Sequence, residues 1–451
     1  STGGRAPESD TEKLLADVFR DVLNLDDDTD LSVDDDFFRL GGDSILAARV
    51  VSFSLKQGLT FGLRHVFEKR TIAQLAAHLG VEDGTESEVR AEPVAVPPSP
   101  ILEELRESGD APNSWVHTEI IELATTADAD RLGRTLNELR SRTDALRLRV
   151  DPKNKRLWLS EILPPATADD EQPLVVQASS LDEAAEAATS AVNITTGHPV
   201  AIAAVAGTTS TVLVVHAAAA DRRGVHRLAQ QVRALHDDET ADSGAETSLA
   251  NALENIETRG GDSDESRIEV WQALLERAGT KEALFDREQH STVTIPTAAP
   301  GTEREQTLLT AIAQTIPDAV LDVDTSLSAN ERETPIGPLT SAAPVAPGDP
   351  DAAQVHASGE EFVLLRHHNR KGRRTLRKST RPSILLTWEY AAPADESRLE
   401  GHEQLYSGVI RCRHKAGTPD EVAVTLVGFA SDTSVALVDS ITAALTGNTG
   451  Q

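Results

Sequence analysis

Residues 37–45 read Phe37-Phe38-Arg39-Leu40-Gly41-Gly42-Asp43-Ser44-Ile45 and place a serine between two glycines and an apolar run. The glycines allow a tight turn and the close approach of another protein. The run that follows predicts a helix, whose first turn offers unpaired N–H groups and the positive end of the helix dipole to a phosphate. Ser44 is therefore a candidate for modification by a phosphate diester, and Asp43 adds a charge suited to a basic partner. The alternative is an ordinary capped helix start.

Apolar residues recur at helical spacing on both sides of this stretch, which predicts a four-helix bundle over residues 11–80. The first helix, with Thr11 as its N-cap, carries Leu14, Leu15, Val18, Phe19, Val22 and Leu23 on one face. The others begin after Gly42, near Leu63 and at Thr71. Residues 1–10 are small and polar, which predicts a disordered tail, and the acidic, then proline-rich residues 81–98 predict a linker.

Beyond residue 98 the chain alternates helical and strand patterns, which predicts an α/β fold of two lobes, residues 99–265 and 266–451. The acidic stretch Asp237–Glu265 is expected to contain the connection between them. Helical patterns occur at residues 127–142, 181–192, 224–236, 269–277 and 306–315. Strand patterns occur at residues 119–123, 145–150, 200–205, 211–215, 383–389 and 422–428.

The composition restricts partners and compartment. A net charge of −30 argues against nucleic acid, because phosphate backbones bind basic surfaces. No apolar run approaches the ~20 residues that cross a bilayer, and no signal peptide is evident. The single Cys412 excludes a disulfide framework and favours the cytoplasm. Thirteen histidines and one cysteine show no metal-ligand spacing, and no glycine-rich nucleotide loop occurs, so we expect neither a metal nor a nucleotide cofactor.

One segment breaks the acidic trend. Residues 366–381 hold eight basic side chains and no acidic one: Arg366, Arg370, Lys371, Arg373, Arg374, Arg377, Lys378 and Arg381. A solvated loop is the favoured interpretation. A landing site for an acidic partner or a phosphate is the alternative.

Residues 10–80 resemble the peptidyl carrier proteins of nonribosomal peptide synthetases, through the pattern FF-x-LGGDSI and the later VFE-x-x-TIAQLA at Val66–Ala76. The resemblance implies that Ser44 carries 4′-phosphopantetheine, placed there by a phosphopantetheinyl transferase. It also implies an aminoacyl or peptidyl thioester as cargo and adjacent synthetase modules as partners. Asp43 is typical of carriers that serve epimerization domains. No G-x-S-x-G elbow surrounds Ser44, so a hydrolase nucleophile is not expected.

Most of residues 98–446 resembles the condensation/epimerization superfamily, whose members pair two chloramphenicol-acetyltransferase-like lobes around a tunnel. The residues Val214-Val215-His216-Ala217-Ala218-Ala219-Ala220-Asp221 are similar to the central HHxxxDG motif. Residues 337–345 are similar to the epimerization-type GWFTSxYPV, and residues 144–149, 364–366 and 383–390 resemble further motifs in order. The resemblance therefore implies an epimerization-like domain.

The residues that move protons in this superfamily are missing. Ala217 stands where the second histidine belongs, and a methyl group cannot accept a proton. Ser328 corresponds to the glutamate of an EGHGR-type motif. His216 and Asp221 remain as motif remnants with an expected structural role, and Arg222 replaces the glycine, where it fills or gates the tunnel. We expect no epimerase activity.

Three functions remain open for this second region. The first is an inactive platform that recruits a trans-acting tailoring enzyme to the carrier-bound substrate. The second is altered condensation, cyclisation or release through substrate positioning. The third is a structural spacer between modules. His226 is more simply a packing residue than a relocated base, and His367-His368 is a chance imitation of the motif.

Overall fold

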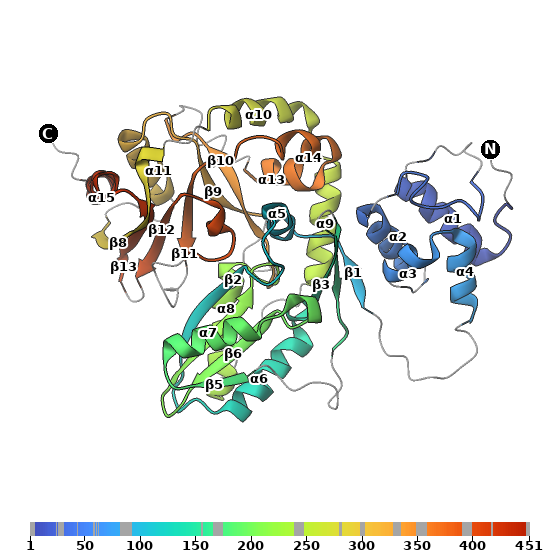
Figure 1. Cartoon of the computed structure of the whole chain (residues 1–451), viewed down its shortest axis with the longest axis horizontal. Helices are drawn as coiled ribbons and strands as arrows, with labels where there is room; N and C mark the ends of the chain where they lie inside the picture. Colours follow the sequence, from blue (N-terminus) through green and yellow to red (C-terminus); the bar gives the residue numbers. More distant parts are fainter. Residues whose placement is uncertain are drawn as a thin grey trace. The chain divides into compact units, whose positions relative to one another are not determined.

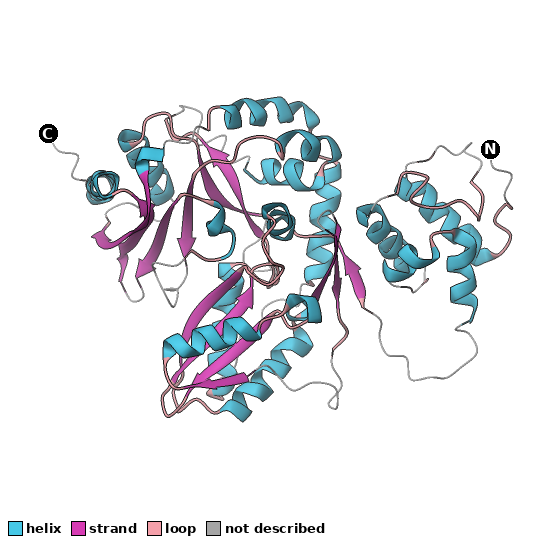
Figure 2. Ribbon diagram, in the orientation of Figure 1, coloured by secondary structure: helices cyan, strands magenta, loops and turns pink. Residues whose placement is uncertain are grey.

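The structure is a computed structural model of the chain, shown in Figures 1 and 2. It describes residues 5–23, 25, 31–42, 44–56, 59, 61, 63–81, 93–154, 157–165, 175–238, 248–278, 282–297, 303–327, 335–348, 359–389, 399–415 and 418–447. The chain divides into two compact units. Unit 1 comprises Ser1–Pro98, Arg147–Glu171 and Thr195–Gly197, and unit 2 comprises Ser99–Leu146, Gln172–Ile194 and His198–Gln451.

Unit 1 begins with the predicted bundle. Its described helices are α1 (Asp10–Leu23), α2 (Ser44–Lys56), α3 (Leu63–Lys69) and α4 (Ile72–Val81). Its core contains the fully buried side chains of Leu15, Phe19, Val50, Ile72 and Leu75. Their spacing along each helix is the apolar periodicity that predicted the bundle, which is confirmed.

The start of α1 differs from the prediction. Ser9, not Thr11, caps the helix: its Oγ accepts the N–H of Glu12 at 3.1 Å, and the Glu12 carboxylate accepts the N–H of Ser9 at 3.1 Å. This reciprocal pair is a capping box. The Arg5 guanidinium is also paired with Glu12. Residues 5–10, expected in a disordered tail, are therefore structured: Asp10 begins α1, and the Arg5 carbonyl accepts the Val33 N–H at 2.9 Å.

Unit 1 also contains a small antiparallel sheet of order β1-β4-β3, formed by β1 (Val94–Val96), β4 (Leu157–Ile162) and β3 (Leu148–Asn154). Part of the stretch expected to be a linker is thus a strand. The strand predicted at residues 145–150 starts later, because Asp144–Arg147 is a 3-10 helix.

Unit 2 has a four-stranded sheet of order β2-β7-β6-β5: β2 (Val116–Glu122), β7 (Ser210–His216), β6 (Val200–Val205) and β5 (Val175–Ala178). Helix α7 (Leu181–Ala191) packs its Ala184 and Ala188 against one face. Helix α8 (Arg222–His236) lies along β2 beside α6 (Ala129–Arg142). The strands and helices predicted here are confirmed to within a few residues at their ends.

The second sheet of unit 2 has the order β10-β9-β11-β12-β13-β8. Its strands are β10 (Thr340–Val345), β9 (Leu321–Ser326), β11 (Ile384–Glu389), β12 (Gly408–Lys415), β13 (Thr418–Phe429) and β8 (Phe285–Pro296). Helices α11 (Arg304–Thr315) and α15 (Ser431–Thr446) cover one face through Leu308, Ile312, Leu437 and Ile441. The short 3-10 helix η7 (Gly401–Leu405) lies on the other face, where Tyr406 packs on Leu385 and Val409.

The helix α10 (Ile268–Glu276) was predicted, and several further helices were not. These are α5 (Pro100–Ser108), α9 (Leu249–Gly261), α13 (Gly359–His368) and α14 (Arg370–Leu376). The stretch Asp237–Glu265, expected to contain the connection between the lobes, includes the helix α9. The solvated loop predicted for the basic segment is also wrong, because α13 and α14 occupy most of it. Within the described residues, no helix combines the length and apolar character that crossing a membrane requires.

Candidate functional site

The loop before α2 is held by aromatic packing. Phe37 is fully buried, and its ring meets that of Phe19 edge-on at 5.0 Å. The Phe37 N–H donates to the Arg70 carbonyl at 2.8 Å, and the Phe37 carbonyl accepts the Gly42 N–H at 3.0 Å. A Cβ on Gly42 would lie 2.4 Å from the Phe37 ring, so only glycine fits there. Gly41 has φ +104°, which also favours glycine.

Ser44 is the first residue of α2, directly after this fixed turn. Asp43 lies outside the described residues. A turn locked by Phe37 and Gly42 that delivers a serine to the first position of a 13-residue helix fits a phosphopantetheine attachment point. Phosphopantetheine supplies a thiol that holds an acyl group as a thioester.

His216 ends β7 and has 0 % exposed surface. Its Nδ1 accepts the Ala218 N–H at 3.1 Å, so Nε2 carries the ring proton and donates to the Pro112 carbonyl at 2.7 Å. Burial lowers the pKa of His216 to about 4. The imidazole is therefore neutral, and neither nitrogen is available to a substrate.

The four residues after His216 are small and enclosed. Ala217, Ala218, Ala219 and Ala220 have exposed fractions of 2 %, 1 %, 0 % and 0 %. The Ala217 N–H donates to the Trp115 carbonyl at 2.9 Å, which ties this segment to the chain entering β2. The position of the expected catalytic base is thus a buried methyl group that cannot exchange protons.

Asp221 caps α8. Its Oδ1 accepts the Gly224 N–H at 2.8 Å, and its Oδ2 accepts the Thr340 hydroxyl at 2.9 Å. Its own N–H donates to the Gly337 carbonyl at 3.1 Å. Burial raises the pKa of this carboxyl. Asp221 therefore links the N-terminus of α8 to Thr340, the first residue of β10, and to Gly337 just before it.

Arg222 makes ion pairs with two carboxylates of the η7 segment. Its guanidinium lies 3.6 Å from Glu400 and 2.9 Å from Glu403. Glu403 also accepts hydrogen bonds from Arg411 at 3.0 and 2.7 Å, and Glu400 accepts the Thr118 N–H at 3.2 Å. Burial opposes ionisation, yet Arg222 and Arg411 hold the pKa of Glu403 well below its usual range. Arg222 is thus a fixed member of a buried network.

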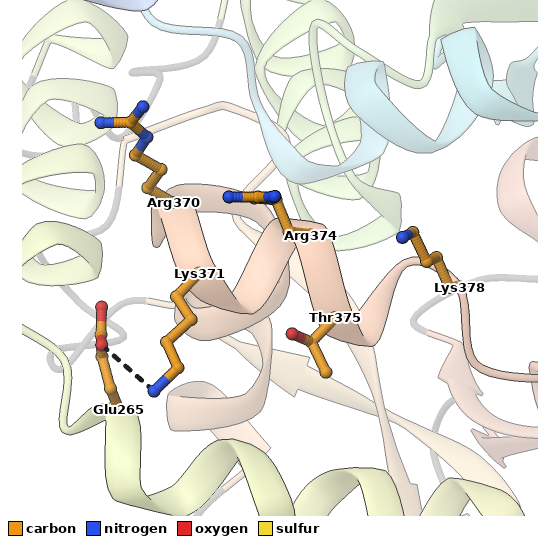
Figure 3. Close-up of a pocket in the computed structure, with 6 residues that line it drawn as sticks. All are labelled: Glu265, Arg370, Lys371, Arg374, Thr375 and Lys378. Atoms are coloured by element: carbon orange, nitrogen blue, oxygen red, sulfur yellow. Dashed lines mark ion pairs between the residues drawn. The ribbon is translucent and has the colours of Figure 1, made fainter.

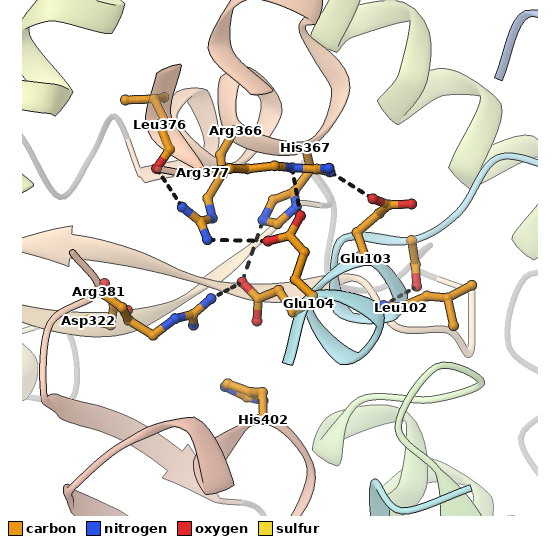
Figure 4. A network of polar contacts seen from close by, with 12 residues as sticks. Leu102, Glu103, Glu104, Asp322, Arg366, His367, Leu376, Arg377, Arg381 and His402 are labelled. Carbon is orange, nitrogen blue, oxygen red and sulfur yellow. Dashed lines mark hydrogen bonds and ion pairs between the residues drawn. The ribbon is translucent and has the colours of Figure 1, made fainter. Parts of the chain in front are cut away.

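A second polar cluster involves the basic segment and α5 (Figure 4). Arg377 pairs with Glu103 at 2.8 Å and Glu107 at 2.7 Å, and Arg381 pairs with Glu104 at 3.1 Å. The buried Asp322 accepts the Tyr406 hydroxyl at 2.7 Å, and burial raises the pKa of Asp322 to about 6.

The remaining candidate histidines also have partners. His226 lies 2.8 Å from Glu119, a hydrogen bond that raises its pKa. His367 lies 3.5 Å from Glu104, and His368 lies 2.6 Å from Glu257. Ser328 lies outside the described residues, so its surroundings stay a matter of prediction. Glu400, Glu403 and Arg411 were missed from the sequence, because no local pattern connects them to Arg222.

Comparison with known proteins agrees with the two parts of the chain. The model of the phosphopantetheine attachment site family matches residues 13–79. A linear gramicidin synthase chain of Brevibacillus parabrevis is 30 % identical over 187 residues, which are 41 % of this chain and 3 % of that protein. The dimodular nonribosomal peptide synthase of Bacillus subtilis is 42 % identical over 80 residues, which are 18 % of this chain and 3 % of that protein. The chain therefore spans a small fraction of these curated relatives.

Two solved structures share the fold of the larger part. The epimerization domain from the third module of tyrocidine synthetase B has a TM-score of 0.61 and 15 % identity, covering 80 % of this chain and 98 % of that one. A chain in the complex of the X-domain and OxyB from teicoplanin biosynthesis has a TM-score of 0.52 and 17 % identity, covering 80 % and 94 %. At these identities the likeness shows the fold.

The two findings assign the two parts separately. The family match gives the bundle its cofactor, covalent 4′-phosphopantetheine. The structural matches cover most of the rest of the chain. This chain is thus a phosphopantetheine-carrying domain, like those of nonribosomal peptide synthetases, followed by a domain with the condensation/epimerization fold.

Proposed function

We propose that this chain displays an aminoacyl or peptidyl thioester on phosphopantetheine at Ser44, ahead of an epimerization-like domain that does not epimerize and recruits a trans-acting tailoring enzyme. One observation carries the proposal: both nitrogens of His216 bond to the backbone, and the next side chain is the buried methyl of Ala217. Because no base faces a substrate at this segment, binding is the function that it supports best.

The ion pairs of Arg222 support the same interpretation. They join α8 to η7 with buried charges, which stiffens the domain in one arrangement. A rigid domain offers a constant surface to a partner. The complex of the X-domain and OxyB is a solved case in which a domain of this fold is bound to another protein.

The rest of the assembly belongs to this proposal. A phosphopantetheinyl transferase modifies Ser44, adjacent synthetase modules supply and remove the acyl group, and the work takes place in the cytoplasm. No role for nucleic acid or membrane is part of it.

The test has two arms on the full chain. The first loads Ser44 with an L-aminoacyl-pantetheine, releases the amino acid after incubation and separates its enantiomers; we expect only the L form. The second measures binding of the tailoring enzymes of the same pathway to the chain by biolayer interferometry; we expect saturable binding that persists in Ser44→Ala. Appearance of the D form, or absence of binding by every such enzyme, contradicts the proposal.

A further inference from the structure

The cations of the basic segment (residues 366–381) fall into an inner set and an outer set that differ in their carboxylate partners. Its inner cations, Arg377 and Arg381, pair with carboxylates of α5. Its outer cations are exposed and line a cavity of about 390 Å³ together with Thr375 and Glu265; they are Arg370, Lys371, Arg374 and Lys378. Figure 3 shows Arg370 and Arg374 one turn apart on α14 and Lys378 after the end of this helix, while Lys371 reaches toward Glu265.

The outer cations are poorly compensated. Lys371 lies 3.7 Å from Glu265, whereas Arg370, Arg374 and Lys378 have no carboxylate partner in the described part of the chain. This is unusual for a protein with 73 acidic and 43 basic residues. Like charges four residues apart, such as Arg370 and Arg374, also destabilise an isolated helix. The arrangement therefore opposes the stability of α14 rather than supporting it.

The backbone of α14, which carries three of these cations, is fixed by a side-chain cap at its start and by close packing on α13. Asn369 is 4 % exposed, and its side chain accepts the N–H groups of Lys371 at 3.0 Å and Gly372 at 2.9 Å. A Cβ on Gly372 would lie 2.1 Å from the Leu365 carbonyl, which shows how closely α14 approaches α13. Leu376 is fully buried. The backbone that presents the four cations is thus organised before any ligand arrives.

We propose that this cavity binds a small molecule that carries two adjacent phosphate groups. Guanidinium groups match phosphate oxygens bidentately, lysines add point charges, and the Thr375 hydroxyl supplies a neutral donor. Arg370 and Arg374 are separated by about 6 Å along the helix axis, and Lys378 lies beyond the end of the helix, so the cations are spread over a length that suits two adjacent phosphates. Four cations against one carboxylate match a multiply charged anion. The proposal stands independently of tailoring-enzyme recruitment.

The experiment is isothermal titration calorimetry of the full chain with pyrophosphate at physiological ionic strength without divalent cations. We expect saturable binding at one site. Arg374→Gln and Lys378→Gln should each weaken it by about 10- to 100-fold, the loss of one charge-assisted contact of ~1.5–3 kcal/mol. Arg373→Gln is the matched control, because Arg373 lies on the same helix but outside the cavity, and it should leave affinity within about threefold.

Further ligands define the chemistry. Orthophosphate and citrate should bind at least about tenfold more weakly than pyrophosphate. A nucleoside diphosphate that binds more tightly than pyrophosphate identifies a nucleotide as the source of the two phosphates, and equal affinity identifies the diphosphate itself. The proposal is overturned if pyrophosphate does not bind, if Arg373→Gln weakens it as much as Arg374→Gln, or if orthophosphate or citrate binds equally well. Lys378 lies beyond the end of α14, so its variant keeps the test valid if Arg374→Gln impairs folding.

Discussion

The attachment segment and the His216 segment differ in where their contacts come from. The turn that leads to Ser44 is held by Phe19, Phe37, Gly42 and Arg70, all within the carrier bundle. The segment from His216 to Arg222 is held by residues spread along the second domain: Pro112, Trp115, Gly337, Thr340, Glu400 and Glu403. The first is a local structure, and the second is assembled from distant parts of the sequence.

The two segments therefore differ in the role of their polar groups. In the carrier, apolar rings and glycines fix a turn and leave the start of α2 to carry chemistry. In the second domain, every retained polar residue of the motif bonds to another part of the fold. Retention of His216 and Asp221 is therefore a mark of architecture, and catalysis cannot be inferred from the motif letters alone.

The most severe change that we predict is the loss of phosphopantetheine modification when Ser44 is replaced. Ser44→Ala removes the hydroxyl on which we propose that the phosphate diester forms, so modification should be lost completely. Intact-protein mass spectrometry after treatment with a phosphopantetheinyl transferase and coenzyme A measures this as the absence of one added phosphopantetheine. Ser54→Ala is the control, since Ser54 lies on the same helix, and it should be modified fully. Modification of Ser44→Ala would move the attachment point elsewhere.

The bundle was predictable because its information is contiguous. Apolar residues at helical spacing fall in the core, and the two glycines fall where the turn needs them. The start of α1 was not predictable from the sequence. Ser9 lies in a run of small polar residues, and its role as the cap depends on the hydrogen bonds that it exchanges with Glu12.

The second domain was predictable in some of its strands and in the alanine at position 217. Its ion pairs were not predictable, nor were strands β5, β8, β9, β10 and β12, for which no strand was predicted. Strand β6 could be placed at its observed bounds because it is apolar throughout and buried. Arg222 could be flagged as unusual, yet its partners Glu400 and Glu403 lie far along the chain and carry no motif. The basic segment was misjudged as a loop for the same reason, since the acids that neutralise its inner face belong to α5.

Removing the charge of Glu403 tests whether its buried ion pairs with Arg222 and Arg411 stabilise the second domain. Glu403→Gln leaves Arg411 and Arg222 without their shared carboxylate in a site where Glu403 is 0 % exposed. Breaking a buried pair in this way costs ~3–5 kcal/mol, so the free energy of unfolding of the second domain should fall by that amount in urea denaturation. Carrier modification at Ser44 should be unchanged, because the bundle has its own core.

The control for this change is an exposed pair in the same unit. Glu138 and Arg142 form an ion pair on α6 with side-chain exposures of 53 % and 39 %. Glu138→Gln should cost less than about 1 kcal/mol. Equal losses in Glu403→Gln and Glu138→Gln would show that the Arg222 network does not stabilise the domain.

The smallest effect, and the one that bears most directly on His216, is a dependence of stability on pH. The folded His216 has a pKa of about 4, below its ordinary 6.5, so between these values the unfolded chain takes up a proton that the folded chain does not. Stability therefore falls as the pH decreases through this window. At ~1.4 kcal/mol per pH unit, His216 accounts for ~2 kcal/mol of loss between pH 7 and pH 5.

His216→Gln keeps a donor for the Pro112 carbonyl and removes this titration, so its loss of stability between pH 7 and pH 5 should be ~2 kcal/mol smaller than that of the unchanged chain. His367, whose pKa burial lowers to about 3, acts in the same direction and leaves a remaining slope. His226→Gln is the opposing control: Glu119 raises the pKa of His226, so that histidine stabilises the fold at low pH and loses its effect as the pH rises. An unchanged slope in His216→Gln, measured by urea denaturation at each pH, would mean that the pKa of His216 is the same in the folded and the unfolded chain, which contradicts a neutral, buried imidazole.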